Sequence, residues 1–172
     1  MLTNNILAVI QYFSDHGIQI GKTILQKIVY LSFDEENKRK FYRPYFYGPY
    51  SEVIQLMVNS LVGNDLVNYR DDRRLELVGS TSYSFMEPFK ERFINTVGFL
   101  FKNDIKSTKE ISNLAKVNMI VANNNGNSKN PNFIIERAGF LGWSELSSLS
   151  VNEIKSLIIL NDELESLLAP NS

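Results

Sequence analysis

The sequence predicts a mainly α protein: a winged-helix-like N-terminal domain over residues 1–79 and a helical half over residues 80–172. Two observations lead to this fold class. Three stretches of the first half have apolar residues at helical spacing, and two short alternating segments follow them, which is the order of a three-helix domain with a wing-like β-hairpin. Beyond the segment Gly-Ser-Thr-Ser-Tyr-Ser at 79–84, which suits a linker, only helical patterns occur.

The first two helices are predicted from apolar stripes. Gly17 suits the end of the first helix because glycine readily takes the left-handed conformation found there. A second helix begins near Gly21, and its pattern fades into the charged run 34–40. The stripes consist of Leu2, Ile6, Val9, Ile10 and Phe13 in the first helix, and of Ile24, Leu25, Ile28 and Leu31 in the second.

An aromatic segment, residues 41–50, separates the second helix from the third. Aromatic residues favour extended structure and its two prolines block a helix, so we expect an extended stretch. Ser51 can cap a third helix that ends at Gly63-Asn64. Residues 66–69 and 74–78 then read as the two strands of the hairpin, since Leu75 and Leu77 alternate with polar residues.

The second half carries helical signals only. Ser107 with Glu110, and Ser150 with Glu153, have the spacing of capping boxes at the start of two helices. An earlier helix follows Pro88. Between the capped helices we expect an asparagine-rich loop at 123–132 and a short helix at 133–140.

Composition excludes several function classes. The chain of 172 residues has no cysteine, so disulfides, thiolate nucleophiles and cysteine-bound zinc are excluded. The net charge is −1 and neither half is basic, whereas strong nucleic-acid binders are usually basic. No apolar run approaches the roughly 20 residues of a membrane helix, and the first residues lack the basic start of a signal peptide. We therefore expect a cytoplasmic protein.

The motifs that suggest chemistry are weak, so we expect no enzyme, no cofactor and no metal. Gly21-Lys22-Thr23 resembles the end of a phosphate-binding loop, but the motif's first glycine is replaced by His16. His16 is the single histidine, and its position at the end of a helix favours a capping role. The adjacent pairs Glu35-Glu36 and Asp71-Asp72 lie in charged stretches, where carboxylates are usually solvated.

Two groups of residues are candidate binding sites. The aromatic segment could anchor a protein partner, although we expect most of its aromatics to pack against the helices, with a basic rim exposed beside them. The partner-binding candidates are Lys38, Arg39, Lys40, Arg43, Tyr45, Tyr47 and Tyr50.

The alternative candidates would contact DNA. Gln55 and Asn59 are predicted on the outer face of the third helix, and three arginines lie at the tip of the hairpin. Glu52 on the same helix face would repel phosphate, and acidic residues near the arginines make intramolecular pairs at least as plausible. The arginines are Arg70, Arg73 and Arg74.

The motifs at 21–31 (GKTILQKIVYL) and 45–51 (YFYGPYS), followed by the stretch 61–67, resemble the Panacea domain family, which includes SocA-like antitoxins and YwgA-like proteins. The resemblance covers residues 20–68, less than a third of the chain, and Ile24 stands where many relatives have a basic residue. It implies a winged-helix-like, largely helical module. Some members of the family neutralise toxins, and some act as adaptors that deliver a toxin to a protease. Leu25 and Tyr30 read as core, Gln26 and Lys27 could be exposed, and Gly48-Pro49 reads as a turn.

We therefore expect a non-catalytic protein that binds a toxin-like or protease-linked protein partner. The alternative is a winged-helix DNA-binding transcriptional regulator, which could form a homodimer through its C-terminal helices.

Overall fold

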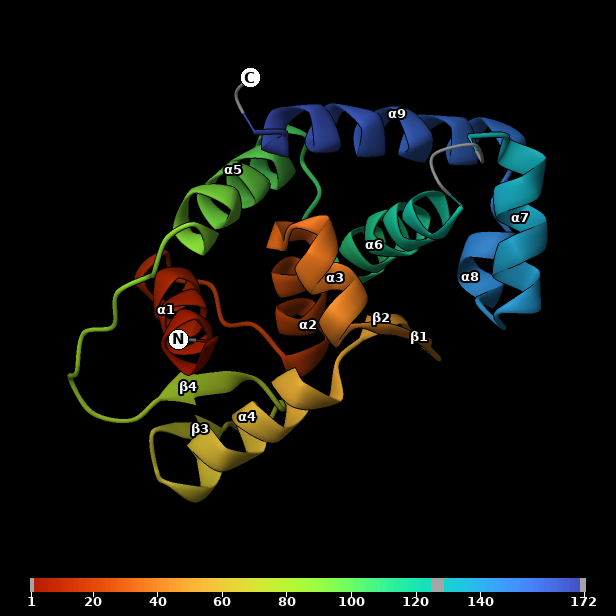
Figure 1. Cartoon of the computed structure of the whole chain (residues 1–172). Coiled ribbons are helices and arrows are strands. Elements are labelled where there is room, and N and C mark those ends of the chain that lie inside the picture. The colour runs from red at the N-terminus through yellow and green to blue at the C-terminus, as the bar shows by residue number, and fades with distance from the viewer. Residues whose placement is uncertain (1, 125–128, 171–172) are drawn as a thin grey trace.

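The fold is mainly helical with a winged-helix-like layout in its N-terminal half, as the sequence predicts (Figure 1). The computed structural model describes residues 2–124 and 129–170. In chain order the elements are α1 (Leu2–Asp15), α2 (Lys22–Ser32), α3 (Glu35–Phe41), β1 (Arg43–Tyr45), β2 (Gly48–Tyr50), α4 (Glu52–Gly63), β3 (Val67–Tyr69), β4 (Leu75–Leu77), α5 (Phe89–Lys102), α6 (Thr108–Asn123), α7 (Pro131–Phe140), α8 (Ser144–Ser147) and α9 (Val151–Leu168).

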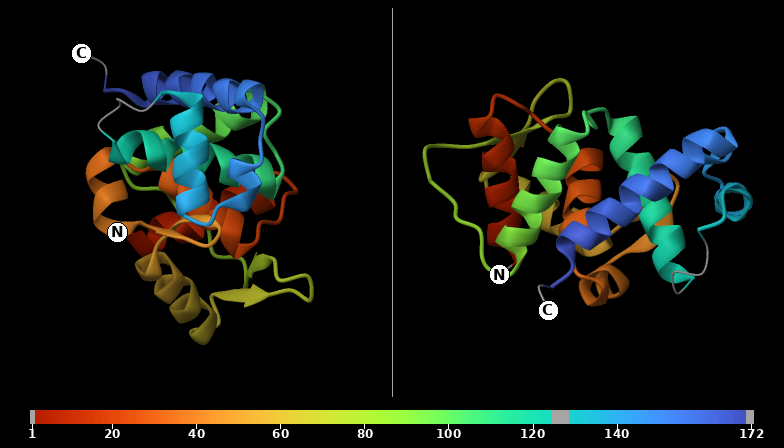
Figure 2. Two further views of the ribbon diagram at one scale, coloured as in Figure 1. Left: turned by 90° about the vertical axis from the view of Figure 1, so that its right-hand side faces the viewer. Right: turned by 90° about the horizontal axis from the view of Figure 1, so that it is seen from above.

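Helix α6 forms the centre of the molecule. Every residue from Ile111 to Val121 is buried, although four of them are polar. The helix packs against α2, α9, α7, α8 and β2, and α9 crosses above it in both Figure 1 and Figure 2. Because α2 belongs to the first half of the chain and α9 to the second, both halves contribute to one cluster of buried side chains.

The winged-helix-like part is built from α1, α2, α4 and the antiparallel pair β3–β4. Val67 pairs with Leu77 and Tyr69 with Leu75, while Gly21 forms a bridge with Arg74 that adds a short third edge. Ser51 caps α4 as predicted, since its Oγ accepts a bond from the N–H of Ile54 at 3.2 Å. Both expected strands of this hairpin are confirmed, each slightly shorter than predicted.

The charged run after α2 is a helix of its own, which the sequence reading missed. Phe33 leaves the helical conformation, and the carboxylate of Asp34 then accepts a bond from the N–H of Asn37 at 2.8 Å. This cap starts α3, and its acidic first turn and basic last turn both suit the helix dipole.

The aromatic segment forms a second hairpin instead of a single extended stretch. Strands β1 and β2 pair antiparallel, with Tyr45 opposite Gly48 and a two-residue turn at Phe46-Tyr47. Gly48-Pro49 is therefore part of a strand and not the turn that the sequence reading placed there. Gly48 has a φ of +101°, which a residue with a side chain rarely adopts, and this conformation lets the chain leave the tight turn.

The capping boxes of α6 and α9 are both present as predicted. The helix expected at 133–140 is α7, which starts two residues earlier with Pro131 in its first turn. Of the expected loop at 123–132, residues 125–128 lie outside the described residues. Among the described residues, no helix combines the length and the apolar character needed to cross a membrane.

Candidate functional site

The turn of the β1–β2 hairpin exposes three consecutive aromatic side chains, which we call the aromatic hairpin: Tyr45, Phe46 and Tyr47. Phe46 and Tyr47 are 74% and 73% exposed, and Tyr45 is also exposed. The Tyr45 ring stacks on Tyr50 with centroids 5.0 Å apart and meets Phe46 edge to face at 4.8 Å. The expectation that most aromatics of this segment would pack inside is thus wrong for these three, whereas Tyr42 is buried.

Three buried side chains from other elements hold the backbone of this hairpin. Gln26 of α2 bonds both backbone groups of Ser51: its Nε2 donates to the carbonyl oxygen at 2.9 Å and its Oε1 accepts from the N–H at 3.1 Å. Lys27 Nζ donates to the carbonyl oxygen of Pro49 at 2.6 Å. On the other side, Trp143 Nε1 donates to the carbonyl oxygen of Tyr45 at 2.6 Å.

Gln26 and Lys27 are therefore buried, which corrects the expectation that they could be exposed. The physical reason is that α2 is covered by α5, α6 and β2. The polar residues beside its apolar stripe therefore also face protein. Their polar groups bond backbone atoms more than twenty residues away in sequence. Leu25 and Tyr30 lie in the core as expected.

A small pocket, which we call the lysine pocket, lies between the aromatic hairpin and the start of α2. Its volume is about 170 Å³. Burial, together with the positive charge of Lys116, lowers the pKa of Lys27 to about 8. The pocket is lined by Lys22, Thr23, Gln26, Lys27, Tyr45, Tyr47, Gly48, Tyr50 and Gln55.

Of the four residues predicted to form an exposed basic rim beside the aromatic segment, one is buried. Lys38 is only 3% exposed, and its Nζ bonds Glu165 at 2.9 Å, Glu35 at 3.0 Å and Asn118 Oδ1 at 3.0 Å. Lys38 is therefore a buried link between helices, because α6 and α9 cover the face of α3 from which it extends. The basic rim consists of the exposed side chains Arg39, Lys40 and Arg43.

Four of the five DNA-contact candidates contact other side chains of the protein, and the fifth, Arg73, is exposed. Gln55 Nε2 donates to Asn59 Oδ1 at 2.8 Å on the surface of α4. Arg70 lies 4.0 Å from Glu76, and Arg74 lies 3.4 Å from Asp72, which confirms intramolecular pairs at the hairpin tip. The outer face of α4 also exposes Leu56, at 66%, where a cation would suit phosphate better.

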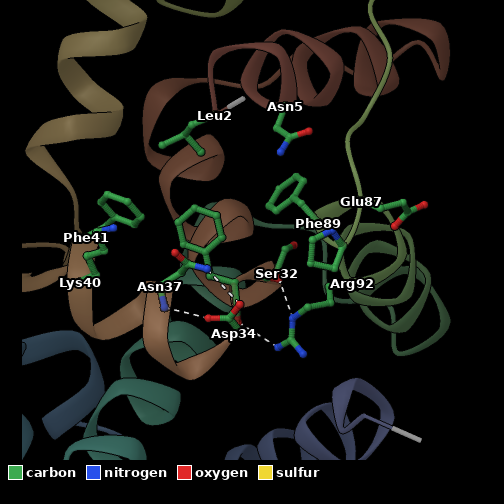
Figure 3. A pocket seen from close by; sticks show the side chains of 12 residues that line it. Leu2, Asn5, Ser32, Asp34, Asn37, Lys40, Phe41, Glu87, Phe89 and Arg92 are labelled. Atoms are coloured by element: carbon green, nitrogen blue, oxygen red, sulfur yellow. Dashed lines mark hydrogen bonds between the residues drawn. The ribbon is translucent and has the colours of Figure 1, made fainter.

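A second pocket of about 260 Å³ lies between α1, α3 and α5 (Figure 3). Its walls are mainly apolar, including Phe33, Phe41 and Phe89. Arg92, at its edge, donates to the carbonyl oxygens of Ser32 and Phe33 at 3.0 and 2.9 Å and to that of Leu168 at 2.7 Å. Since these bonds occupy the guanidinium group, Arg92 joins the ends of α2 and α9 and is not directed at a ligand.

Within residues 2–124 and 129–170, no three His, Asp or Glu side chains come together as metal ligands would. The Nδ1 of His16 donates to the carbonyl oxygen of Tyr12, 2.7 Å away, at the end of α1, as its predicted capping role requires. Comparison of the chain with known protein families, curated proteins and solved structures finds no match.

Proposed function

We propose that this protein is a non-catalytic binding module whose aromatic hairpin contacts a protein partner, in the manner of an antitoxin or an adaptor. The observation that carries the proposal is a fixed backbone bearing uncovered aromatic rings. Gln26, Lys27 and Trp143 fix the hairpin from two sides, while Phe46 and Tyr47 remain exposed.

This combination suits protein recognition for two physical reasons. Aromatic side chains supply large contact areas and are enriched among the residues that contribute most to binding at interfaces. A backbone that is already ordered loses little conformational entropy when a partner binds. The basic rim of Arg39, Lys40 and Arg43 adjoins the hairpin in the chain and would speed the approach of an acidic partner.

The resemblance of residues 20–68 to the Panacea domain supports the same proposal, because that family includes toxin-neutralising proteins. The partner would then be a toxin-like or protease-linked protein, and the protein would act in the cytoplasm. From the same resemblance we also propose that the protein has no catalytic activity.

DNA binding is the second candidate, and the β3–β4 wing beside α4 favours it. The acidic and apolar outer face of α4 and the paired arginines weaken this alternative. Fluorescence anisotropy with duplex DNA at low salt distinguishes the two functions. A regulator would bind and lose affinity steeply as salt is added, whereas the proposed module would not bind.

The proposal is tested by affinity capture from the source cells with three forms of the protein. Wild type is compared with Phe46→Ser/Tyr47→Ser, and with Phe140→Ser as the matched control. Phe140 is 78% exposed on α7, so its replacement removes an equally exposed aromatic ring elsewhere. We expect one protein that wild type and Phe140→Ser retain and the hairpin variant loses by at least about tenfold, the loss typical of an interface hot spot.

Retention of every captured protein by the hairpin variant at wild-type levels would contradict the proposal. Circular dichroism of the three proteins shows whether each is folded. Because Phe46 and Tyr47 are exposed, their replacement is expected to leave the free energy of unfolding within about 0.5 kcal/mol.

A further inference from the structure

The lysine pocket contains a buried ammonium group without a carboxylate partner. Lys27 is 3% exposed, and its Nζ donates to the carbonyl oxygen of Pro49. An ammonium group has three N–H donors, so one acceptor leaves it incompletely bonded. Within the described part of the chain, no Asp or Glu oxygen lies within 4.0 Å of the Nζ of Lys22 or Lys27.

The start of α2 adds positive potential to the same pocket. Lys22 and Thr23 are the first residues of this eleven-residue helix and both line the pocket. The first N–H groups of a helix have no intrahelical acceptor, and they carry the positive end of the helix dipole. Gly21 at the N-cap position has no side chain that could accept from them. An oxyanion at this place would therefore be stabilised by the helix as well as by the lysines.

A second lysine, Lys116, adds positive charge next to Lys27. A Cβ atom on Gly48 would lie 2.9 Å from Cγ of Lys116 and 3.5 Å from Cε of Lys27, so both side chains pass beneath this glycine. The pKa of Lys116 is also lowered by burial. Two cations that are close together and partly desolvated repel each other, and a bound anion would relieve this repulsion.

The lining and the size of the pocket restrict the ligand. Its lining includes cations, amides, hydroxyls and aromatic rings but no acidic residue. The volume of about 170 Å³ is below the roughly 300 Å³ of a typical small-molecule site, so the pocket suits one side chain and not a cofactor. The rings of Tyr45, Tyr47 and Tyr50 in this lining can pack against the methylene groups of an Asp or Glu side chain, which a free phosphate ion lacks.

We propose that the lysine pocket binds the carboxylate of an Asp or Glu side chain of the protein partner, with Lys22 and Lys27 as counter-charges. The aromatic hairpin flanks this contact, because Tyr45 and Tyr47 belong to both surfaces. This inference rests on the proposed function and adds the chemistry of the contact. A carboxylate of the partner enters the lysine pocket, and the rings of the aromatic hairpin contact the partner beside it.

The test is an NMR titration of the full chain with two blocked amino acids, N-acetylglutamate N-methylamide and the matching glutamine compound. These probes differ in charge and hardly in shape. The glutamate probe should shift the Lys22 and Lys27 side-chain signals and bind at least about tenfold more tightly than the glutamine probe, since charged hydrogen bonds are the stronger class. Inorganic phosphate should bind more weakly than the glutamate probe.

Matched variants locate the effect. Lys22→Met removes an exposed cation at the pocket and Lys155→Met removes an exposed cation on α9, so both should fold. Lys22→Met should weaken binding of the glutamate probe several-fold, and Lys155→Met should not. Lys27→Met should abolish the charge preference, and Lys22→Met carries the test if the Lys27 variant does not fold.

Equal affinity for the two probes, tighter binding of phosphate, or wild-type affinity in Lys22→Met would overturn the proposal. These outcomes are separable from failure of the proposed function. A partner whose capture depends on Phe46 but not on Lys22 leaves the binding module intact and removes the carboxylate anchor. Selective binding of the glutamate probe without any Phe46-dependent partner would support the carboxylate site and contradict the proposed function.

Discussion

Gln26 links two parts of the chain that are 25 residues apart, because its amide satisfies both backbone groups of the fully buried Ser51. Lys27, the next residue, bonds the strand just before it. Two neighbouring polar side chains of α2 thus fix both the aromatic hairpin and the start of α4. Removal of Gln26 takes the acceptor from the N–H of Ser51, and removal of Lys27 takes the donor from the carbonyl oxygen of Pro49. An unsatisfied buried polar group costs more than an ordinary hydrogen bond contributes.

Gln26→Ala is predicted to lower the free energy of unfolding by about 1–3 kcal/mol, since the buried N–H of Ser51 loses its acceptor, whereas the carbonyl oxygen of Ser51 keeps its bond from the N–H of Gln55. Gln55→Ala is the matched control: the side chain of Gln55 donates to the exposed Asn59 and holds no buried backbone group, so its loss should cost less than about 0.5 kcal/mol. Urea denaturation followed by circular dichroism measures both. Similar losses for the two variants would show that the Gln26 contact does not stabilise the hairpin.

A second prediction concerns the pH dependence of stability. The folded-state pKa of Lys27 is about 8, and the unfolded value is near 10.5, so the native protein binds fewer protons than the unfolded chain between these values. The free energy of unfolding should therefore rise between pH 8 and 10, by on the order of 2 kcal/mol. Above that range the pKa values of Tyr30 and Tyr42, which burial raises, act in the opposite direction.

Urea denaturation of wild type and Lys27→Met across pH 8–10 measures this effect. The rise should be clearly smaller in the variant, although Lys116, whose pKa is also lowered, contributes with the same sign. An identical slope in both proteins would show that the Lys27 ammonium group is not desolvated in the folded state.

The burial of Gln26, Lys27 and Lys38 could not be predicted from the sequence. Helical periodicity identifies the apolar stripe of a helix, and it assigns polar residues beside that stripe to the surface. These three residues are buried because elements far away in the chain cover them and supply their bonding partners. The exposure of Phe46 and Tyr47 is the converse case, since aromatic composition alone favours the interior.

Among the elements, those with strong local signals were predictable. The capping serines Ser51, Ser107 and Ser150 mark the starts of α4, α6 and α9, and alternation marks β3 and β4. Helix α3, the β1–β2 hairpin and the four-residue α8 were not anticipated. Each is short, and each depends on a contact such as the Asp34 cap or the Trp143 bond to Tyr45, whose partner an apolar pattern does not identify.

Trp143→Phe is predicted to loosen the aromatic hairpin without unfolding the protein. Phenylalanine keeps most of the buried ring but cannot donate to the carbonyl oxygen of Tyr45. Hydrogen exchange should become several-fold faster at the amides of residues 45–48 and stay unchanged in β3–β4, whose strands this bond does not reach. Unchanged exchange at residues 45–48 would mean that the indole bond does not hold the turn.

At the scale of the whole molecule, the two predicted halves share one core. Phe93 of α5 meets both Tyr12 and Phe13 of α1 edge to face, with ring centroids 5.2 and 6.2 Å apart. Lys38 joins α3 to α6 and α9 through Asn118 and Glu165. The segment 79–84, predicted as a linker, is itself attached, since Tyr83 N–H donates to Gln11.

A fragment of residues 1–79 is therefore predicted not to fold by itself. It would expose the faces of α1 and α2 that α5 and α6 cover in the full chain. Thermal unfolding followed by circular dichroism should show no cooperative transition for the fragment and one for the full chain. A cooperative transition in the fragment would establish residues 1–79 as an independent domain.

The central claim is that the aromatic hairpin is where the partner binds. Site-specific photo-crosslinking in the source cells tests it most directly, with p-benzoylphenylalanine placed at Phe46 in one protein and at Phe140 in another. Both positions are similarly exposed, so random collisions should label them equally. We expect one discrete crosslinked protein from position 46 and none from position 140. A discrete product from position 140 alone, or the same products from both, would contradict it.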